Sequence, residues 1–130
     1  MDNELTETKQ AEVALIRDTD LGEVLKPLIR EIHLFDSYVA GTSYLPDDSV
    51  LTAIQEGELL SLEREDNKFD SNAILVLTGD RRKLGYVPEK DNIVFARLMD
   101  AGKCLKARIT SVKKRGSFTQ IGIGIYLVDF

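Results

Sequence analysis

Two segments near the C-terminal end of the chain, residues 103–112 and 119–128, constrain its fold most. Apolar and polar side chains alternate along each of them. Side chains of a β-strand point to opposite faces in turn, so this alternation is typical of strands with one buried face. Residues 115–117 (Arg-Gly-Ser) lie between the two segments and are typical of a tight turn, so the sequence predicts a β-hairpin. Gly122 and Gly124 share one face of the second strand, which indicates a tight bend or a close neighbour.

Four more strands and two short helices are expected before this hairpin. Runs bounded by turn residues predict strands over 34–40, 58–65, 72–78 and 83–87. Residues 47–49 (Asp-Asp-Ser) are suited to cap a helix over 49–55, and Pro88 and Gly102 bound a second helix over 89–101. About six short strands with two helices in their connections are typical of a mainly β protein. We expect a small OB- or SH3-like β-barrel that is closed or nearly closed.

The N-terminal part of the chain has a different pattern. Residues 1–20 are polar and suggest a loose helix or a tail, whereas apolar residues in 22–32 recur at spacings of three and four. This spacing predicts an amphipathic helix over 22–32, which packs on its own domain or contacts a partner. We therefore expect an N-terminal helical extension over 1–33 and a β-barrel domain over 34–130.

Composition narrows the class of protein. The chain has 130 residues, of which 43% are apolar, which suits one folded domain. The single Cys104 leaves no internal disulfide, and no apolar run approaches the ~20 residues that span a bilayer. The first ten residues lack the layout of a signal peptide. We expect a cytoplasmic protein with no membrane partner.

The sequence offers little chemistry for catalysis. With one His and one Cys, it lacks the ligands of a structural zinc site. It has no Walker loop and no GxSxG nucleophile motif, and the lone His33 has no companion motif. We therefore expect no metal, no cofactor and no enzymatic activity of the chain's own.

The charged residues are unevenly distributed. The net charge is −5, which disfavours nonspecific binding to nucleic acid because phosphates need a positive surface. Basic residues nevertheless cluster at 81–83 and again between Lys103 and Arg115. A nearly neutral domain can still present a basic face. The second cluster is equally well explained as a solvated strand edge protected by Lys and Arg.

Two polar-aromatic clusters are the candidate binding elements. Tyr44 follows Gly41 at a strand end, and Phe69 lies within the polar segment 67–72. Exposed rings on barrel loops can stack on nucleic-acid bases, and Asp70 can accept a hydrogen bond from a sugar hydroxyl. Alternatively, the Asn and Asp side chains of this segment only fold a tight turn, and Phe69 is a core plug.

Residues 39–44 (VAGTSY), 62–76 (LEREDNKFDSNAILV) and 84–88 (LGYVP) resemble the HIRAN domain in order and spacing across residues 34–128. The element N-x-[FY]-D-x-N-A-[IV]-x-V is the specific part of this resemblance. The family has a modified OB-like barrel. It occurs at the N-terminus of Swi2/Snf2-type helicases such as helicase-like transcription factor, and alone or with nuclease and repair modules in bacteria. The helicase-fused members grip the free 3′ end of single-stranded DNA and help to remodel stalled replication forks.

The resemblance implies a nucleic-acid site formed by Ser43, Tyr44, Asn67, Phe69, Asp70, Tyr86 and Lys90. The DNA-binding members have Arg-Tyr-Tyr where this chain has Ser43, Tyr44 and Leu45, so one ring is kept and the Arg is lost. A family His is replaced by Tyr86, and a family lysine matches Glu89 or, with a slip of one residue, Lys90.

We expect a stand-alone module that recognises single-stranded DNA 3′ ends or damaged or stalled-fork DNA. It would act with a helicase or nuclease partner, because it has no catalysis of its own. The alternative is a protein-interaction adaptor that keeps the fold without DNA-end binding. A nuclease or hydrolase subunit would need a catalytic partner in trans.

Overall fold

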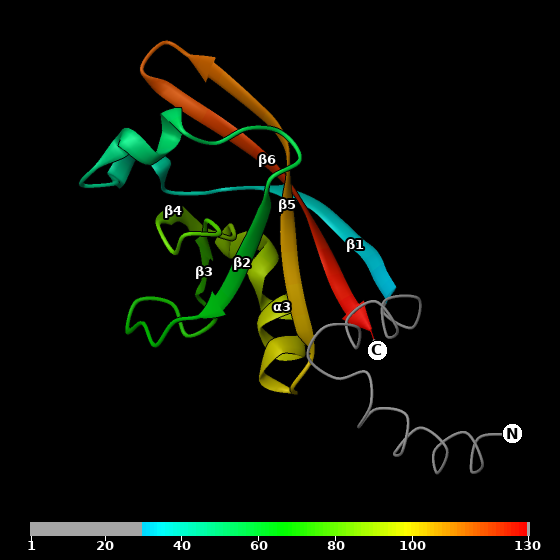
Figure 1. Cartoon of the computed structure of the whole chain (residues 1–130). Coiled ribbons are helices and arrows are strands. Elements are labelled where there is room, and N and C mark those ends of the chain that lie inside the picture. Colours follow the sequence, from blue (N-terminus) through cyan, green and yellow to red (C-terminus); the bar gives the residue numbers. More distant parts are fainter. Residues whose placement is uncertain (1–29, 130) are drawn as a thin grey trace, which may run out of the picture. The chain divides into compact units, whose positions relative to one another are not determined.

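The computed structural model describes residues 30–129, and this part of the chain contains six strands and one α-helix (Figure 1). The strands are β1 (Arg30–Tyr38), β2 (Leu59–Arg64), β3 (Ile74–Leu77), β4 (Lys83–Tyr86), β5 (Cys104–Arg115) and β6 (Phe118–Asp129). The helix is α3 (Glu89–Asp100), and two 3-10 turns, η2 (Thr42–Tyr44) and η3 (Asp48–Thr52), follow β1. The predicted mainly β barrel is confirmed. No helix of the described part of the chain is long and apolar enough to cross a membrane.

The hairpin of β5 and β6 is the longest feature of the sheet and was expected from the sequence. The two strands pair antiparallel from Cys104 and Val128 at one end to Arg115 and Phe118 at the other. The register shifts at Thr110, and this bulge lets both Ile109 and Val112 face buried isoleucines of β6. The predicted close neighbour of Gly122 is Ser111, whose Oγ would lie 2.6 Å from an added Cβ.

The strand order β1-β6-β5-β2-β3-β4 leaves β1 and β4 at the two ends of the sheet. The chain just after β1 closes this gap, because Ala40 and Tyr86 exchange two backbone hydrogen bonds of 2.7 and 2.9 Å. The approach requires glycine at position 85, where an added Cβ would lie 2.2 Å from the carbonyl oxygen of Ala40. A single bridge therefore closes the barrel beside Tyr86.

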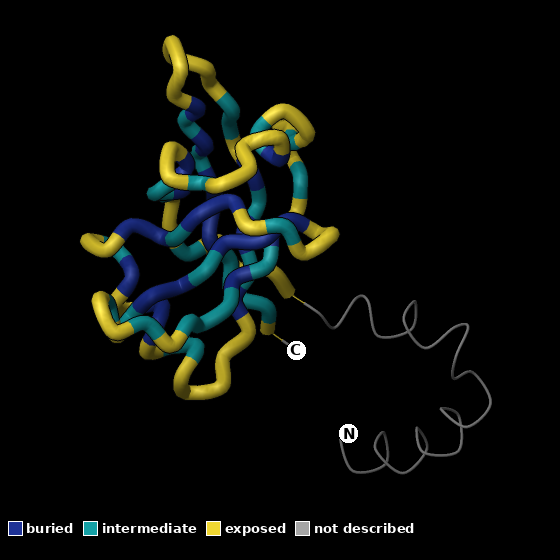
Figure 2. Tube along the Cα trace, turned by 90° about the vertical axis from the view of Figure 1, so that its left-hand side faces the viewer, coloured by how far each residue is buried: buried dark blue, intermediate teal, exposed yellow. Residues whose placement is uncertain are grey.

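The core lies inside the curved sheet and is covered in part by α3. The fully buried side chains of the core include Leu60, Ile74, Val76, Leu84, Ile109, Ile121, Ile123 and Ile125. From α3, Phe95 and Ala96 join this core, while the outward side of the helix keeps Ile93 and Val94 exposed. Figure 2 shows buried residues along the middle of the sheet and exposed ones at the loops.

Three expectations differ from the structure. β1 begins at Arg30, so the last three residues of the helix expected over 22–32 are in a strand, and residues 22–29 lie outside the described residues. The helix expected over 49–55 is the 3-10 turn η3, although Asp47 caps it as expected by accepting a 3.0 Å hydrogen bond from the Ser49 amide. Of the N-terminal helical extension expected over 1–33, residues 30–33 lie in β1, and residues 1–29 lie outside the described residues.

Candidate nucleic-acid interface

The segment between β2 and β3 is folded by its own polar side chains. Oδ1 of Asn67 accepts a 2.8 Å hydrogen bond from the amide of Phe69, and Oδ1 of Asp70 accepts one of 2.9 Å from the amide of Asn72. These are the side-chain-to-backbone bonds expected of a tight turn, so that part of the turn interpretation is right. The core-plug part is wrong, because Phe69 is 85% exposed.

Arg64 at the end of β2 ties this turn to the barrel. Its guanidinium donates to the carbonyl oxygens of Ser71 (2.8 Å) and Ala73 (2.6 Å), and it also pairs with Asp100 at the end of α3. The hydrogen bond between them raises the pKa of Arg64 and lowers the pKa of Asp100. The turn is thus held from β2 and, through Asp100, from the helix.

A second contact from α3 fixes the Asp70 carboxylate. Asn92 is 2% exposed, and its Nδ2 donates a 2.8 Å hydrogen bond to Oδ2 of Asp70. Both carboxylate oxygens therefore have a partner, and each retains a lone pair for a further donor. The position of Asp70 is set by its own turn on one side and by a buried amide on the other.

The turn and the barrel closure enclose a small depression of about 220 Å³, which we call the loop cavity. It is lined by Ala40, Asn67, Asp70, Ala73, Tyr86, Val87 and Glu89. The structure thus brings together Asn67, Asp70 and Tyr86, three of the residues that the sequence singled out. They come from the β2–β3 turn and from β4, which the pairing of Leu75 with Tyr86 brings together, while the bridge to Tyr86 adds Ala40.

Tyr86 is held in this cavity by charged neighbours. Its hydroxyl donates a 2.7 Å hydrogen bond to Oε2 of Glu65, an oxygen that also accepts one of 3.1 Å from the Asn67 side chain. The ammonium of Lys83 donates to the Tyr86 hydroxyl at 3.2 Å and lies 4.6 Å from the centre of its ring. The rim of the loop cavity therefore combines carboxylates with one cation.

Two exposed rings lie next to this cavity in the chain. Phe69 is at the tip of the turn between Asn67 and Asp70, and Tyr44 is in η2, three residues after Gly41. Tyr44 is 88% exposed, and no other large apolar or aromatic side chain of the described residues is as exposed as these two. The rings do not line the cavity itself, although the resemblance implies one site for all of these residues. Ser43 is exposed beside Tyr44.

Lys90 lies apart from the other candidates. It lines a separate groove of about 450 Å³ between β1 and α3, where its ammonium is 5.5 Å from the centre of the Tyr38 ring. We call this the α3 groove, and it is lined by Leu34, Phe35, Lys90, Asp91, Ile93, Val94, Phe95 and Leu98. The residue before it, Glu89, is the one that reaches the loop cavity. The part of Lys90 in binding stays a prediction.

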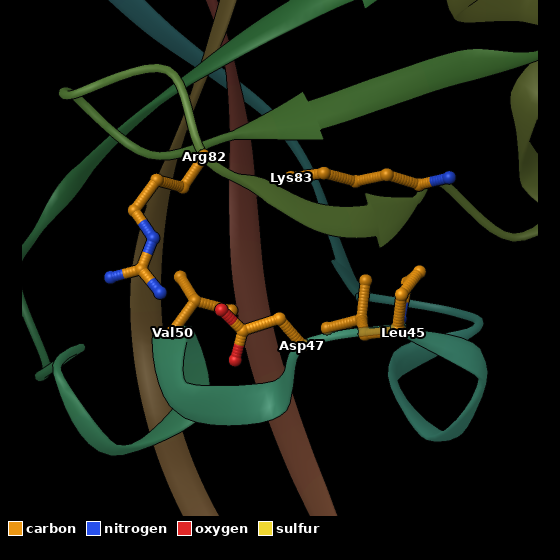
Figure 3. Close-up of a pocket in the computed structure, with 6 residues that line it drawn as sticks. Leu45, Asp47, Val50, Arg82 and Lys83 are labelled. Atoms are coloured by element: carbon orange, nitrogen blue, oxygen red, sulfur yellow. The ribbon is translucent and has the colours of Figure 1, made fainter.

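A third depression, of about 290 Å³, separates η2 and η3 from the start of β4 (Figure 3). Arg82 and Lys83 extend along it in opposite directions, above Asp47 and Leu45. Hydrogen bonds from Ser49 and the nearby charge of Arg82 lower the pKa of Asp47. The position of Lys83 places a cation between this depression and the Tyr86 ring.

Sequence reasoning gave no binding role to Glu65, Lys83 or Asn92. Lys83 was noticed only as part of a basic cluster, and Glu65 only as part of a motif. Asn92 gave no signal, because a polar residue in a helix is normally exposed and its burial depends on the fold.

Comparisons with known proteins identify the family and the fold. The family model of the HIRAN domain matches residues 32–128. This chain belongs to the HIRAN family. HIRAN domains are in general DNA-binding modules rather than catalytic ones. No curated protein matches the sequence.

Two solved structures resemble this HIRAN domain. A protein from Lactobacillus plantarum is 30% identical with a TM-score of 0.72, covering 78% of this chain and 99% of that one. The HIRAN domain of human HLTF is 18% identical with a TM-score of 0.61, covering 75% of this chain and 78% of that one. The second likeness shows the fold alone.

Proposed function

We propose that this HIRAN domain binds the 3′ end of single-stranded DNA. The terminal sugar enters the loop cavity, and bases stack on the exposed rings of Phe69 and Tyr44. The observation that supports this most is a polar cavity whose Asp70 carboxylate is fixed in place, with the almost fully exposed ring of Phe69 on the same turn and that of Tyr44 in η2. Solvent-exposed rings beside a polar groove are the usual platform for single strands, at ~1–3 kcal/mol per base.

The charge of the cavity favours a hydroxyl end over a phosphate end. Asp70 and Glu89 line the cavity, and Glu65 lies behind Tyr86. A carboxylate accepts a hydrogen bond from a 3′-hydroxyl but repels a 3′-phosphate. Two charges ~4 Å apart in water interact by ~1 kcal/mol, so a terminal phosphate should cost about fivefold in affinity.

Lys83 is suited to offset part of the lost family Arg. Ser43 stands at that position and carries no charge, whereas the ammonium of Lys83 lies against Tyr86 at the cavity rim. A cation there is placed to contact the phosphate that precedes the terminal sugar. With few cations and several carboxylates nearby, we expect weak binding, with dissociation constants on the order of 10⁻⁴–10⁻⁶ M.

The test is a titration of labelled trithymidylate with a free 3′-hydroxyl against the same strand with a 3′-phosphate, followed by fluorescence anisotropy. We expect about fivefold tighter binding of the hydroxyl end. Asp70→Asn is the informative variant, because it removes the negative charge while the amide oxygen still accepts from the Asn72 backbone; its NH2 group requires the Asn92 side-chain amide to turn its oxygen toward it. This variant should bind the two ends nearly equally, and its melting temperature checks that the turn is intact. Equal binding of both ends by the unmodified protein would contradict the proposal.

The adaptor is the second candidate function, and the α3 groove favours it. Phe35, Ile93 and Val94 are between 41% and 59% exposed along this groove, and an exposed apolar surface of this kind is a common docking site for another protein. A helicase or nuclease subunit docked there would leave the loop cavity free. The two functions are therefore compatible, and variants in one site should not affect the other.

A further inference from the structure

The turn of the β5–β6 hairpin carries three consecutive cations, Lys113, Lys114 and Arg115, all exposed. This hairpin projects beyond the rest of the sheet in Figure 1, and its tip is the exposed projection at the top of Figure 2. Within residues 30–129, none of the three has a carboxylate within 4.0 Å. The tip is therefore a concentrated positive charge in a chain whose net charge is −5.

Four other bases of the described residues are paired with carboxylates. Arg64 pairs with Asp100, and Arg81 pairs with Glu63. On the same strand as the tip, Lys106 and Arg108 both contact Glu31, whose pKa they lower. β5 pairs with β2 only over residues 106–108, so the three tip cations lie on an open edge of β5, as the strand-edge alternative expected.

The hairpin tip is physically joined to the candidate interface through η2. Oγ1 of the buried Thr42 donates a 3.1 Å hydrogen bond to the carbonyl oxygen of Thr119, the residue that pairs with Lys114 across the hairpin. At the other side of η2, a methyl group added to Gly41 would lie 4.0 Å from Cδ1 of Tyr86. Segment 41–44, which ends at the exposed Tyr44, thus lies against both Thr119 of the hairpin and Tyr86 of the loop cavity.

The three cations do not all face η2. Cross-strand partners project from the same face of a sheet, so Lys114 shares a face with Thr119, and Lys113 shares the opposite face with Gln120. Thr119 is only 8% exposed, whereas Gln120 on the opposite face is half-buried. Lys114 therefore projects from the face that is covered at Thr119, and Lys113 projects from the opposite face.

We propose that Lys114 binds the phosphodiester backbone of a single strand whose 3′ end occupies the loop cavity and whose next bases cross Tyr44. This inference rests on the proposed function for the polarity of the strand. The backbone path from Gly41 through Thr42 and Thr119 to Lys114 is on the order of 15 Å, or about four to five stacked nucleotides at ~3.4 Å each. A trinucleotide is too short to reach Lys114, whereas a decanucleotide reaches it.

The experiment compares trithymidylate with decathymidylate, each with a 3′-hydroxyl or a 3′-phosphate, against the unmodified protein, Lys114→Glu and Lys113→Glu. The two variants make the same change of charge on opposite faces of one hairpin. Lys114→Glu should weaken decathymidylate binding roughly fivefold. It should also reduce the magnitude of the negative slope of log K against log salt by about 0.7, the value for one phosphate contact. It should leave trithymidylate binding within about twofold, and Lys113→Glu should change both strands little.

The outcomes separate this inference from the proposed function. Equal weakening by both variants, or no weakening of decathymidylate binding by Lys114→Glu, would overturn the Lys114 contact. In that case, a preference of the unmodified protein for 3′-hydroxyl ends would still uphold end recognition. A selective effect of Lys114→Glu without any end preference would uphold the hairpin contact and overturn end recognition. Unchanged melting temperatures of both variants exclude unfolding as the cause.

Discussion

The loop cavity and the α3 groove begin at neighbouring residues and have opposite character. Glu89 lines the cavity and Lys90 lines the groove, because successive residues of a helix point about 100° apart. In the cavity, the polar side chains of Asn67, Asp70 and Tyr86 are already bonded to the protein. The groove is mainly apolar, and several of its side chains are exposed.

This difference indicates which kind of ligand each surface can select. Polar groups that are held in place can discriminate between a hydroxyl and a phosphate, because they do not need to be ordered on binding. An exposed apolar groove gains affinity by burying area and discriminates mainly by shape. We therefore assign the nucleic-acid end to the cavity and leave the groove for a protein.

The largest expected effect on stability comes from disrupting the backbone bridge between Ala40 and Tyr86, which closes the barrel beside the loop cavity. Gly85→Ala places a methyl group against the carbonyl oxygen of Ala40 and should destabilise the domain by about 3 kcal/mol in urea denaturation. Gly79→Ala is the matched control, because an added Cβ there meets nothing within 4 Å. If Gly85→Ala were as stable as the control, the single-bridge closure would not be as tight as described.

A smaller effect should come from releasing the turn from β2. Arg64→Ala removes two hydrogen bonds from a charged donor to the turn and should cost about 2 kcal/mol at pH 7. Arg81→Ala is the control, since its pair with Glu63 is largely exposed and should contribute less than ~1 kcal/mol.

The pair between Arg64 and Asp100 adds a pH dependence. Because the pKa of Asp100 is lowered in the folded state, the stability from this pair is present above the ordinary Asp pKa of about 3.9 and is lost as the pH falls through the lowered value. The unmodified protein should therefore lose this contribution in acid, and Arg64→Ala should not. Parallel acid unfolding curves for the two proteins would argue against the pair.

Substitutions of two exposed side chains should have the smallest effect on stability. They test most directly whether the loop cavity and the α3 groove are separate sites. Phe69→Ala should weaken binding of a single strand about tenfold, within the ~1–3 kcal/mol of one stacked base. Val94→Ala in the α3 groove should leave that affinity unchanged. Both residues are more than half exposed, so both variants should keep the melting temperature of the unmodified protein. Equal weakening by both would mean that the two surfaces are not separate.

The parts of the fold that the sequence predicted well are those with a local pattern. The alternation in 103–112 and 119–128 located β5 and β6, and the bounds Pro88 and Gly102 located α3. The predicted start of β1 was wrong. Ile32 continued the helical spacing of residues 22–32, but its conformation is decided by pairing in the sheet. The bulge at Thr110 depends on the register with β6 and has no local signal.

The same limit applies to the candidate site. Asn67 and Asp70 carry a turn signal, and the fold brings them to Tyr86 in one cavity. Glu89 and Lys90 are successive residues of a helix, so their side chains point in different directions and only Glu89 lines the cavity. The motif match allowed a shift of one residue at this point, so it could not decide between the two. The contact of Asp70 with the buried Asn92 joins two elements far apart in sequence, so it follows only from the packed structure.

The most direct test of the assignment is a titration of ¹⁵N-labelled protein with trithymidylate carrying a free 3′-hydroxyl, followed by heteronuclear correlation spectra. We expect the largest shifts at the side-chain amide of Asn67 and at the backbone amides of Asp70, Ala73 and Tyr86, with Phe35 and Val94 unchanged. Shifts concentrated at Phe35, Ile93 and Val94, with the loop cavity unchanged, would contradict the assignment of the nucleic-acid end to this cavity.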